Sequence, residues 1–177
     1  MLVAAVGVCA VAGASPQDAS GPAQKATFLL NFIRFAEWPV GALRSVAPFV
    51  LCVLGDGRVA ESLEAIASGH LVNGHDLIVK QVRADGPIRN CHLLYITDVD
   101  LDESIALVGA RDNAPALTVS DLAGFAQAGG MVNLIVEGDK MRFAVNVEAA
   151  VRARLRLSSR LLTLASVVKD QSTASVR

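Results

Sequence analysis

Short apolar runs alternate with segments of helical spacing between residues 49 and 119, and this alternation restricts the fold more than any other feature. Such runs, bounded by turn residues, are typical of buried strands. The expected strands cover residues 49–54, 77–82, 91–97 and 116–119, and the expected helices cover residues 58–67 and 101–111. Strands that alternate with helices predict a layered α/β sandwich with a mainly parallel sheet and helices on both faces.

The C-terminal third of the chain predicts further scaffold. Residues 131–136 and 141–147 are strand-like runs joined by the polar turn 137–140. This pattern indicates an antiparallel hairpin, which we place at one edge of the sheet. Residues 120–130 are expected to form a short helix that begins at a Ser-Asp cap and ends at two glycines. No catalytic motif falls within residues 116–165.

The segment after the hairpin carries two conflicting patterns. Asn146 is a favourable N-cap for a helix, whereas residues 151–157 alternate as a strand would. A strand would align three arginines on one side, namely Arg152, Arg154 and Arg156. We expect a helix over residues 147–153, a short extended link, and a second helix over residues 159–168 that is capped by Ser158.

An amphipathic helix is expected over residues 23–38 and should end before Pro39, because the residue before a proline disfavours the helical conformation. Phe28, Phe32 and Phe35 fall at i, i+4 and i+7 and form a wide apolar stripe. We expect these rings to lie mostly in the core, with contact to a partner protein as the alternative.

The first fourteen residues have the character of a secretory signal peptide. Residues 2–13 are apolar and mostly small, and Ala12-Gly13-Ala14 offers a small-x-small cleavage site. The usual basic residues are missing, so a buried first strand or helix of a cytosolic protein is the alternative. We expect export with cleavage near Ala14, and no lipid anchor, because Val8 is too bulky for a lipoprotein signal before Cys9.

Length and composition favour one folded domain. The chain has 177 residues, 53% of them hydrophobic, and a net charge of -1. These values argue against disorder and against a nucleic-acid partner, and no apolar run reaches the roughly 18 residues of a transmembrane helix. The expected domain covers residues 22–168, followed by a flexible tail over residues 169–177.

Two cysteines remain if Cys9 leaves with the signal peptide. Cys52 and Cys91 both lie in apolar, strand-like runs and form one even pair. A disulfide between them would stabilise the fold by roughly 4 kcal/mol in the chain-entropy model. Two buried free thiols are the alternative, and a cytosolic location would favour them.

The motif closest to an enzyme signature is Gly55-Asp56-Gly57-Arg58-Val59-Ala60, which follows a strand and precedes a helix. It fits the dinucleotide-binding pattern G-x-G-x-x-G/A. However, Asp56 would place a carboxylate beside the phosphates, and no acidic residue ends a strand about 20 residues later. We therefore favour a tight turn in which Asp56 caps the next helix.

The remaining polar residues do not form a recognisable catalytic set. His70, His75 and His92 are dispersed, so no metal site and no cofactor are expected. The acidic residues near position 100 are interpreted as helix caps and solvated charges. The arginines between residues 152 and 160 form either a solvated surface or a contact for an anionic ligand or acidic partner. The chain is not expected to be an enzyme.

Several phrases spread along the chain resemble the YfiR-type family of small periplasmic proteins, which includes YfiR/HmsC-like domains. The resemblance covers residues 23–165. It is carried by KATFLLNFIRFAEWP (25–39), FVLCVLGDG (49–57), LVNG (71–74), CHLLYI (91–96), LTVSD (117–121), GFAQAGGMVNLIVEGDKMRFAVN (124–146) and LRLSSRLLTLA (155–165).

The resemblance implies a regulator. It implies periplasmic location, repression of an inner-membrane diguanylate cyclase through the cyclase's periplasmic sensor part, and hence low cyclic-di-GMP. It also implies release by an outer-membrane lipoprotein that sequesters the repressor. The family's disulfide falls on Cys52 and Cys91, whereas the second cysteine pair of some members has no counterpart here.

For the partner interface we select exposed charges and one amphipathic aromatic residue near the first and last helices: Arg34, Trp38, Arg152, Arg156 and Arg160. A homodimer is compatible with this reading. The alternative function is a periplasmic module that binds a small ligand, such as a nucleotide or aromatic metabolite, at the Gly55 turn or the arginine cluster.

Overall fold

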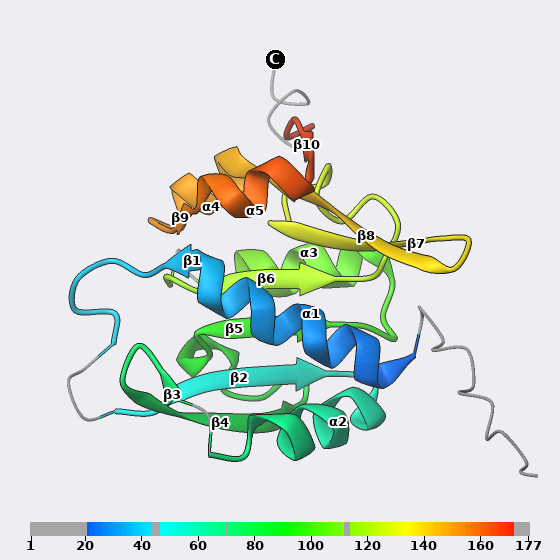
Figure 1. Cartoon of the computed structure of the whole chain (residues 1–177). Helices are drawn as coiled ribbons and strands as arrows, with labels where there is room; N and C mark the ends of the chain where they lie inside the picture. The colour runs from blue at the N-terminus through cyan, green and yellow to red at the C-terminus, as the bar shows by residue number, and fades with distance from the viewer. Residues whose placement is uncertain (1–20, 44–46, 70, 112–113, 172–177) are drawn as a thin grey trace, which may run out of the picture.

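The computed structural model describes residues 21–43, 47–69, 71–111 and 114–171. The expected signal peptide, residues 1–14, lies outside this part of the chain. Eight strands form one sheet in the order β10-β8-β7-β6-β5-β2-β4-β3, with antiparallel pairing at β7–β8 and β3–β4 and parallel pairing elsewhere (Figure 1). The predicted mainly parallel α/β architecture is confirmed.

The strands of this sheet are β2 (Phe49–Leu54), β3 (Leu71–Val72), β4 (His75–Val82), β5 (Leu93–Ile96), β6 (Leu117–Ser120), β7 (Val132–Glu137), β8 (Lys140–Asn146) and β10 (Ser166–Val168). A separate antiparallel pair is formed by β1 (Ala36–Glu37) and β9 (Arg156–Leu157). The order β4-β2-β5-β6-β7 is that of a doubly wound sheet. The order in which successive strands are added reverses between β2 and β5, which are parallel to each other.

The helices are α1 (Pro22–Phe35), α2 (Gly57–Ala67), η1 (Ile88–Asn90), α3 (Leu101–Gly109), α4 (Val147–Arg152) and α5 (Ser159–Leu164). In Figure 1, α1 crosses in front of the sheet and α3 lies behind it. The core is accordingly divided into two clusters. One contains Phe32, Phe49 and Tyr95, and the other contains Cys52, Leu94 and Leu107.

Helix starts follow the expected capping chemistry. The Asp56 side chain accepts a hydrogen bond from the Arg58 amide, and Asp100 accepts from the Glu103 amide. Asn146 and Ser158 accept in the same way from the amides of Ala149 and Leu161. Each of these caps lies where the sequence places it, because a cap depends only on residues two or three positions away.

Four local expectations are wrong. Residues 121–130 form consecutive turns instead of a short helix, and α1 ends at Phe35 instead of reaching Trp38. The last helix ends at Leu164 because residues 166–168 form β10, which pairs with β8. The β7–β8 hairpin is therefore one strand in from the edge of the sheet, not at the edge itself.

The start of the expected flexible tail belongs to the fold. Asp170 is only 8% exposed, and its carboxylate pairs with the guanidinium of Arg152. The Gln171 amide donates to the carbonyl of Gln127. In the described residues, none of the helices has the length and hydrophobicity required to span a membrane.

Candidate functional site

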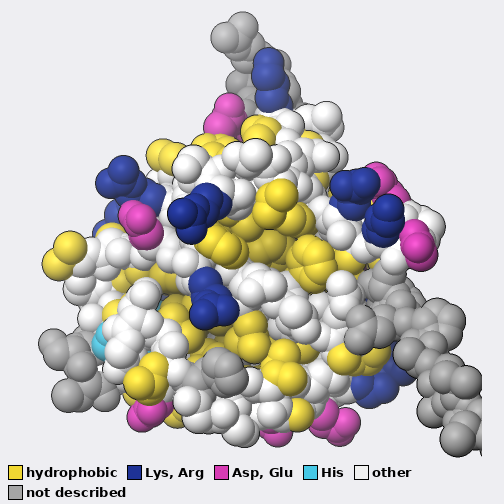
Figure 2. All heavy atoms as spheres, in the orientation of Figure 1, with side chains coloured by type: hydrophobic (Ala, Val, Ile, Leu, Met, Phe, Trp, Pro, Cys, Tyr) yellow, Lys and Arg dark blue, Asp and Glu magenta, His cyan; other side chains and the backbone are white. Residues whose placement is uncertain are grey.

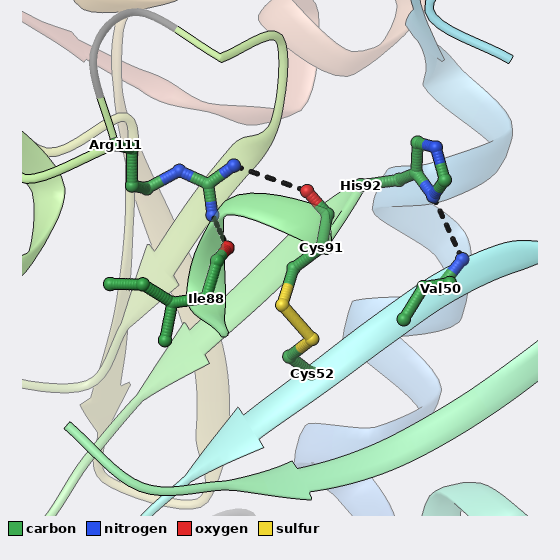
Figure 3. Close-up of a disulfide and its surroundings, with 6 residues drawn as sticks. All are labelled: Val50, Cys52, Ile88, Cys91, His92 and Arg111. Atoms are coloured by element: carbon green, nitrogen blue, oxygen red, sulfur yellow. Dashed lines mark hydrogen bonds between the residues drawn. A yellow bond between two sulfur atoms is a disulfide. The ribbon is translucent and has the colours of Figure 1, made fainter. Parts of the chain in front are cut away.

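Cys52 on β2 and Cys91 just before β5 form a disulfide bond. Their Cα atoms are 5.7 Å apart, and both side chains are almost fully buried (Figure 3). The bond closes a loop with a sequence separation of 39 residues and joins neighbouring strands at the centre of the sheet. The predicted pairing is confirmed, and the alternative of two free thiols does not hold.

His92 follows the disulfide and connects three segments of the chain. Its Nδ1 accepts a hydrogen bond of 2.9 Å from the Val50 amide, as Figure 3 shows, and its ring packs against Phe49 with centroids 5.0 Å apart. Its carbonyl oxygen accepts from Trp38 Nε1 at 3.3 Å. Burial lowers the pKa of His92. The imidazole is therefore held neutral, since a protonated Nδ1 cannot accept the Val50 proton.

The lowered pKa of His92 predicts a loss of stability in mild acid. The unfolded histidine titrates near pH 6.5 and binds the proton more tightly than the folded one. The stabilising contribution is therefore complete above about pH 6.5 and is lost as the pH falls toward the folded pKa. Urea unfolding at pH 7.5 and pH 5.0 measures it. His92→Gln should flatten this dependence, and an equal pH dependence in both proteins would contradict the role of His92.

The Gly55-Asp56-Gly57 motif is explained by packing. Gly55 has a φ of +104°, and a Cβ built there would lie 2.2 Å from the carbonyl oxygen of Thr97. Asp56 caps α2 and also binds Arg58 Nε at 3.0 Å, and the hydrogen bond from Arg58 lowers the Asp56 pKa. The interpretation as a tight turn with a helix cap is confirmed.

Arg34, Arg156 and Arg160 come from α1, β9 and α5, which meet where the β1–β9 pair joins the two helices. The Ser158 amide donates to the carbonyl of Phe35, and this contact brings the start of α5 to the end of α1. All three arginines are exposed. Arg156 Nε lies 4.0 Å from a carboxylate oxygen of Glu37, a pair so exposed that it contributes little to stability.

Apolar side chains gather beside these arginines. Figure 2 shows a broad hydrophobic area across the middle of the face that carries α1 and α5, with Lys or Arg side chains next to it. Partly exposed hydrophobic residues on these two helices include Phe28, Phe35 and Leu162, and Leu164 is 73% exposed. We call this surface, with Arg34, Arg156 and Arg160, the α1–α5 face. Exposed apolar surface flanked by charges is typical of interaction sites.

Trp38 and Arg152 differ from the other selected residues. The Trp38 ring is half-buried and packs edge-on against Phe49 with centroids 4.9 Å apart, so much of it is already used by the fold. Arg152 on α4 pairs with Asp170 and lines a different hollow, together with Arg111. Arg156 and Arg160 thus lie on neighbouring elements beside the end of α1. Arg34 on α1 also borders a hollow toward α2 and β4, and Arg152 lies elsewhere.

Residues 22–166, nearly all of the described chain, match the YfiR/HmsC-like domain family. The chain belongs to the YfiR/HmsC-like family. A crystal structure of a conserved domain protein from Vibrio cholerae O1 biovar eltor has a similar fold, with a TM-score of 0.56 and 12% sequence identity. The match covers 84% of this chain and 60% of the Vibrio chain. At this identity it shows the fold alone.

The YfiR/HmsC-like domain has a partly buried ion pair at the carboxyl end of β6 that the sequence did not reveal. Lys25 Nζ on α1 lies 2.6 Å from an Asp121 oxygen, and a hollow bounded by both residues extends beneath the β7–β8 hairpin. Burial opposes ionisation of Asp121, but hydrogen bonds from Lys25 and Thr97 outweigh it and lower the pKa of Asp121. Burial and the charge of Asp121 raise the pKa of Tyr95.

The lowered pKa of Asp121 predicts a second loss of stability, in stronger acid. Because the folded pKa lies below the usual value of 3.8, the stabilising contribution is present above about pH 4 and is lost as the pH falls below it. Asp121→Asn should cost about 1–3 kcal/mol at pH 7 and reduce the decline between pH 4 and pH 2, measured by urea unfolding. If the wild type and Asp121→Asn lose the same free energy of unfolding between pH 4 and pH 2, the ion pair does not cause this loss.

Proposed function

We propose that this YfiR/HmsC-like domain is a non-enzymatic periplasmic regulator that binds the periplasmic sensor part of an inner-membrane diguanylate cyclase. Bound repressor holds cyclic-di-GMP synthesis down, and an outer-membrane lipoprotein that sequesters the repressor relieves this hold. The observation that carries the proposal is the family match over residues 22–166. Release follows from the difference between the affinities of the two partners for the repressor.

Two further features support an exported regulator. A buried disulfide between central strands is typical of proteins that fold in oxidising compartments, including the bacterial periplasm. The polar side chains that were considered as candidates for catalysis make structural hydrogen bonds. Asp56 and Asp100 cap helices, and His92 accepts a hydrogen bond from a backbone amide. Competitive binding needs no further chemistry from them.

The α1–α5 face is our choice for the cyclase contact. Arginine contributes strongly to interfaces because its guanidinium presents several donors in a fixed geometry, and apolar neighbours exclude water from such contacts. The face combines three exposed arginines with the apolar side chains of α1 and α5. It therefore suits a partner surface that has carboxylates around an apolar centre.

A direct binding measurement tests the proposal. The exported chain and the periplasmic domain of a cyclase encoded beside its gene should form a complex detectable by calorimetry. Arg156→Glu combined with Arg160→Glu should weaken this complex at least about tenfold. Arg83→Glu is the matched control, because Arg83 is 88% exposed and follows β4, away from the α1–α5 face.

The same variants test regulation in cells. Deletion of the gene should raise cyclic-di-GMP, and the wild-type chain and Arg83→Glu should restore the low level. The double variant should not restore it, although it should accumulate in the periplasm to the wild-type amount. Unchanged cyclic-di-GMP after deletion would overturn the proposed function, whereas full repression by the double variant would overturn only the choice of surface.

A further inference from the structure

A cavity lies at the end of α3, next to α4. Its volume is about 180 Å³, and it is bounded by the end of α3, the start of β6, the loop before β7, and α4. Most of its wall is made of glycine and alanine: Gly109, Ala114, Ala116, Gly129, Ala149 and Ala153. The polar side chains on the wall are Arg111, Thr118 and Arg152.

Arg111 is a buried cation without a carboxylate partner among the described residues. It is 3% exposed, and its guanidinium donates to the carbonyl oxygens of Ile88 at 2.9 Å and Cys91 at 3.1 Å (Figure 3). A guanidinium has five N–H donors, and the contacts with described residues use two of them. The carbonyl dipoles offset part of the charge, but burying a cation without an anion is costly. Burial lowers the Arg111 pKa to about 10, so it stays protonated at neutral pH.

The other two polar side chains add to this preference for an anion. Arg152 pairs with the buried Asp170, so in the part of the chain that the structure describes this pair supplies no carboxylate to Arg111. The Thr118 hydroxyl, 1% exposed, accepts a hydrogen bond from the Met131 amide at 3.2 Å. Among the described residues, no acceptor is found for the hydroxyl proton of Thr118. This proton can therefore be donated to a bound anion.

We propose that the cavity between α3, β6 and α4 binds a small carboxylate anion, held by Arg111 and Thr118 with Arg152 at the rim. A carboxylate supplies one negative charge and two coplanar acceptor oxygens, which match the free N–H groups of a guanidinium. A volume of about 180 Å³ is large enough to hold a short carboxylate. The α1–α5 face contributes no residue to the site.

Carboxylate-dependent thermal stability tests this site. The unfolding midpoint of the exported chain should rise with sodium acetate relative to sodium chloride at equal ionic strength and pH 7. A tenfold excess over Kd should raise it by about 3–6 °C. Formate and propionate should act similarly. Arg111→Gln should raise the acetate concentration needed for this increase in the midpoint at least about tenfold. The matched exposed variant Arg83→Gln should respond to acetate as the wild type does.

A measurement on the wild-type chain tests the site even if Arg111→Gln does not fold. Side-chain N–H resonances of arginine report directly on a new acceptor, so the Nε–H signal of Arg111 should shift on acetate titration and saturate. The shift should follow the same half-saturation concentration as the thermal effect. Equal midpoints in acetate and chloride, with no saturable shift of the Arg111 signal, would overturn the proposal.

Discussion

Replacing both bridge cysteines, Cys52→Ala with Cys91→Ala, is expected to lower the free energy of unfolding by about 4 kcal/mol. The disulfide closes a loop with a separation of 39 residues, and opening it returns chain entropy to the unfolded state. The unfolding midpoint should fall by about 8–16 °C, since 1 kcal/mol corresponds to roughly 2–4 °C in a domain of this size. Calorimetry or circular dichroism measures the change.

Reduced wild-type protein is the matched control for the alanine variant. Denaturation with excess reductant should give a midpoint near that of the variant, whereas reductant without denaturant should have little effect because both sulfurs are buried. A variant as stable as the oxidised wild type would contradict the stabilising role of the bridge. If the chain is a periplasmic repressor, the variant should also accumulate less and repress less, through loss of folded protein.

Gly55→Ala is the single substitution expected to cost the most, at about 2–6 kcal/mol. Gly55 has a φ of +104°, a conformation that L-residues rarely adopt, and this strain costs about 1–3 kcal/mol. The new Cβ would also lie 2.2 Å from the Thr97 carbonyl oxygen, so β2 and β5 would have to separate at their carboxyl ends. The resulting overpacking adds about 1–3 kcal/mol.

Gly57→Ala in the same motif is the control. A Cβ at Gly57 would lie 3.1 Å from Nε2 of the flexible Gln81 side chain, and Gly57 is the first residue of α2. The free energy of unfolding should change by less than about 1 kcal/mol. Urea unfolding without any ligand compares the two variants. Equal stability of the two variants would show that neither the backbone conformation of Gly55 nor its contact with Thr97 requires glycine.

These substitutions separate stability from partner binding. The disulfide and the Gly55 turn both connect β2 with β5, the pair of strands at which the strand order of the doubly wound sheet reverses. Ligand-binding α/β proteins commonly place their site at this point. Here the β2–α2 turn is filled by the close contact of Gly55 with Thr97 and by the Asp56 cap. The proposed contacts with other molecules lie instead on the α1–α5 face and in the Arg111 cavity.

The features that the sequence determined by itself are local. The strand at 49–54, the strand expected at 131–136 and found one residue later, the turn before α2, and the caps at Asp100 and Asn146 follow from residues a few positions apart. Periodicity and capping act over one or two turns of chain, so they can be identified without knowing the tertiary fold. The cysteine pair was also accessible, because an even count in an exported chain favours a bond.

Only the tertiary structure decided which distant residues meet. Lys25 and Asp121 pair across 96 positions, β10 joins β8 in place of a longer last helix, and Arg111 is buried against η1. No local pattern distinguishes such a lysine or arginine from the solvated ones. The free energy of these contacts comes from burial and from hydrogen bonds between segments, and it overrides local helix preference where a strand edge is available.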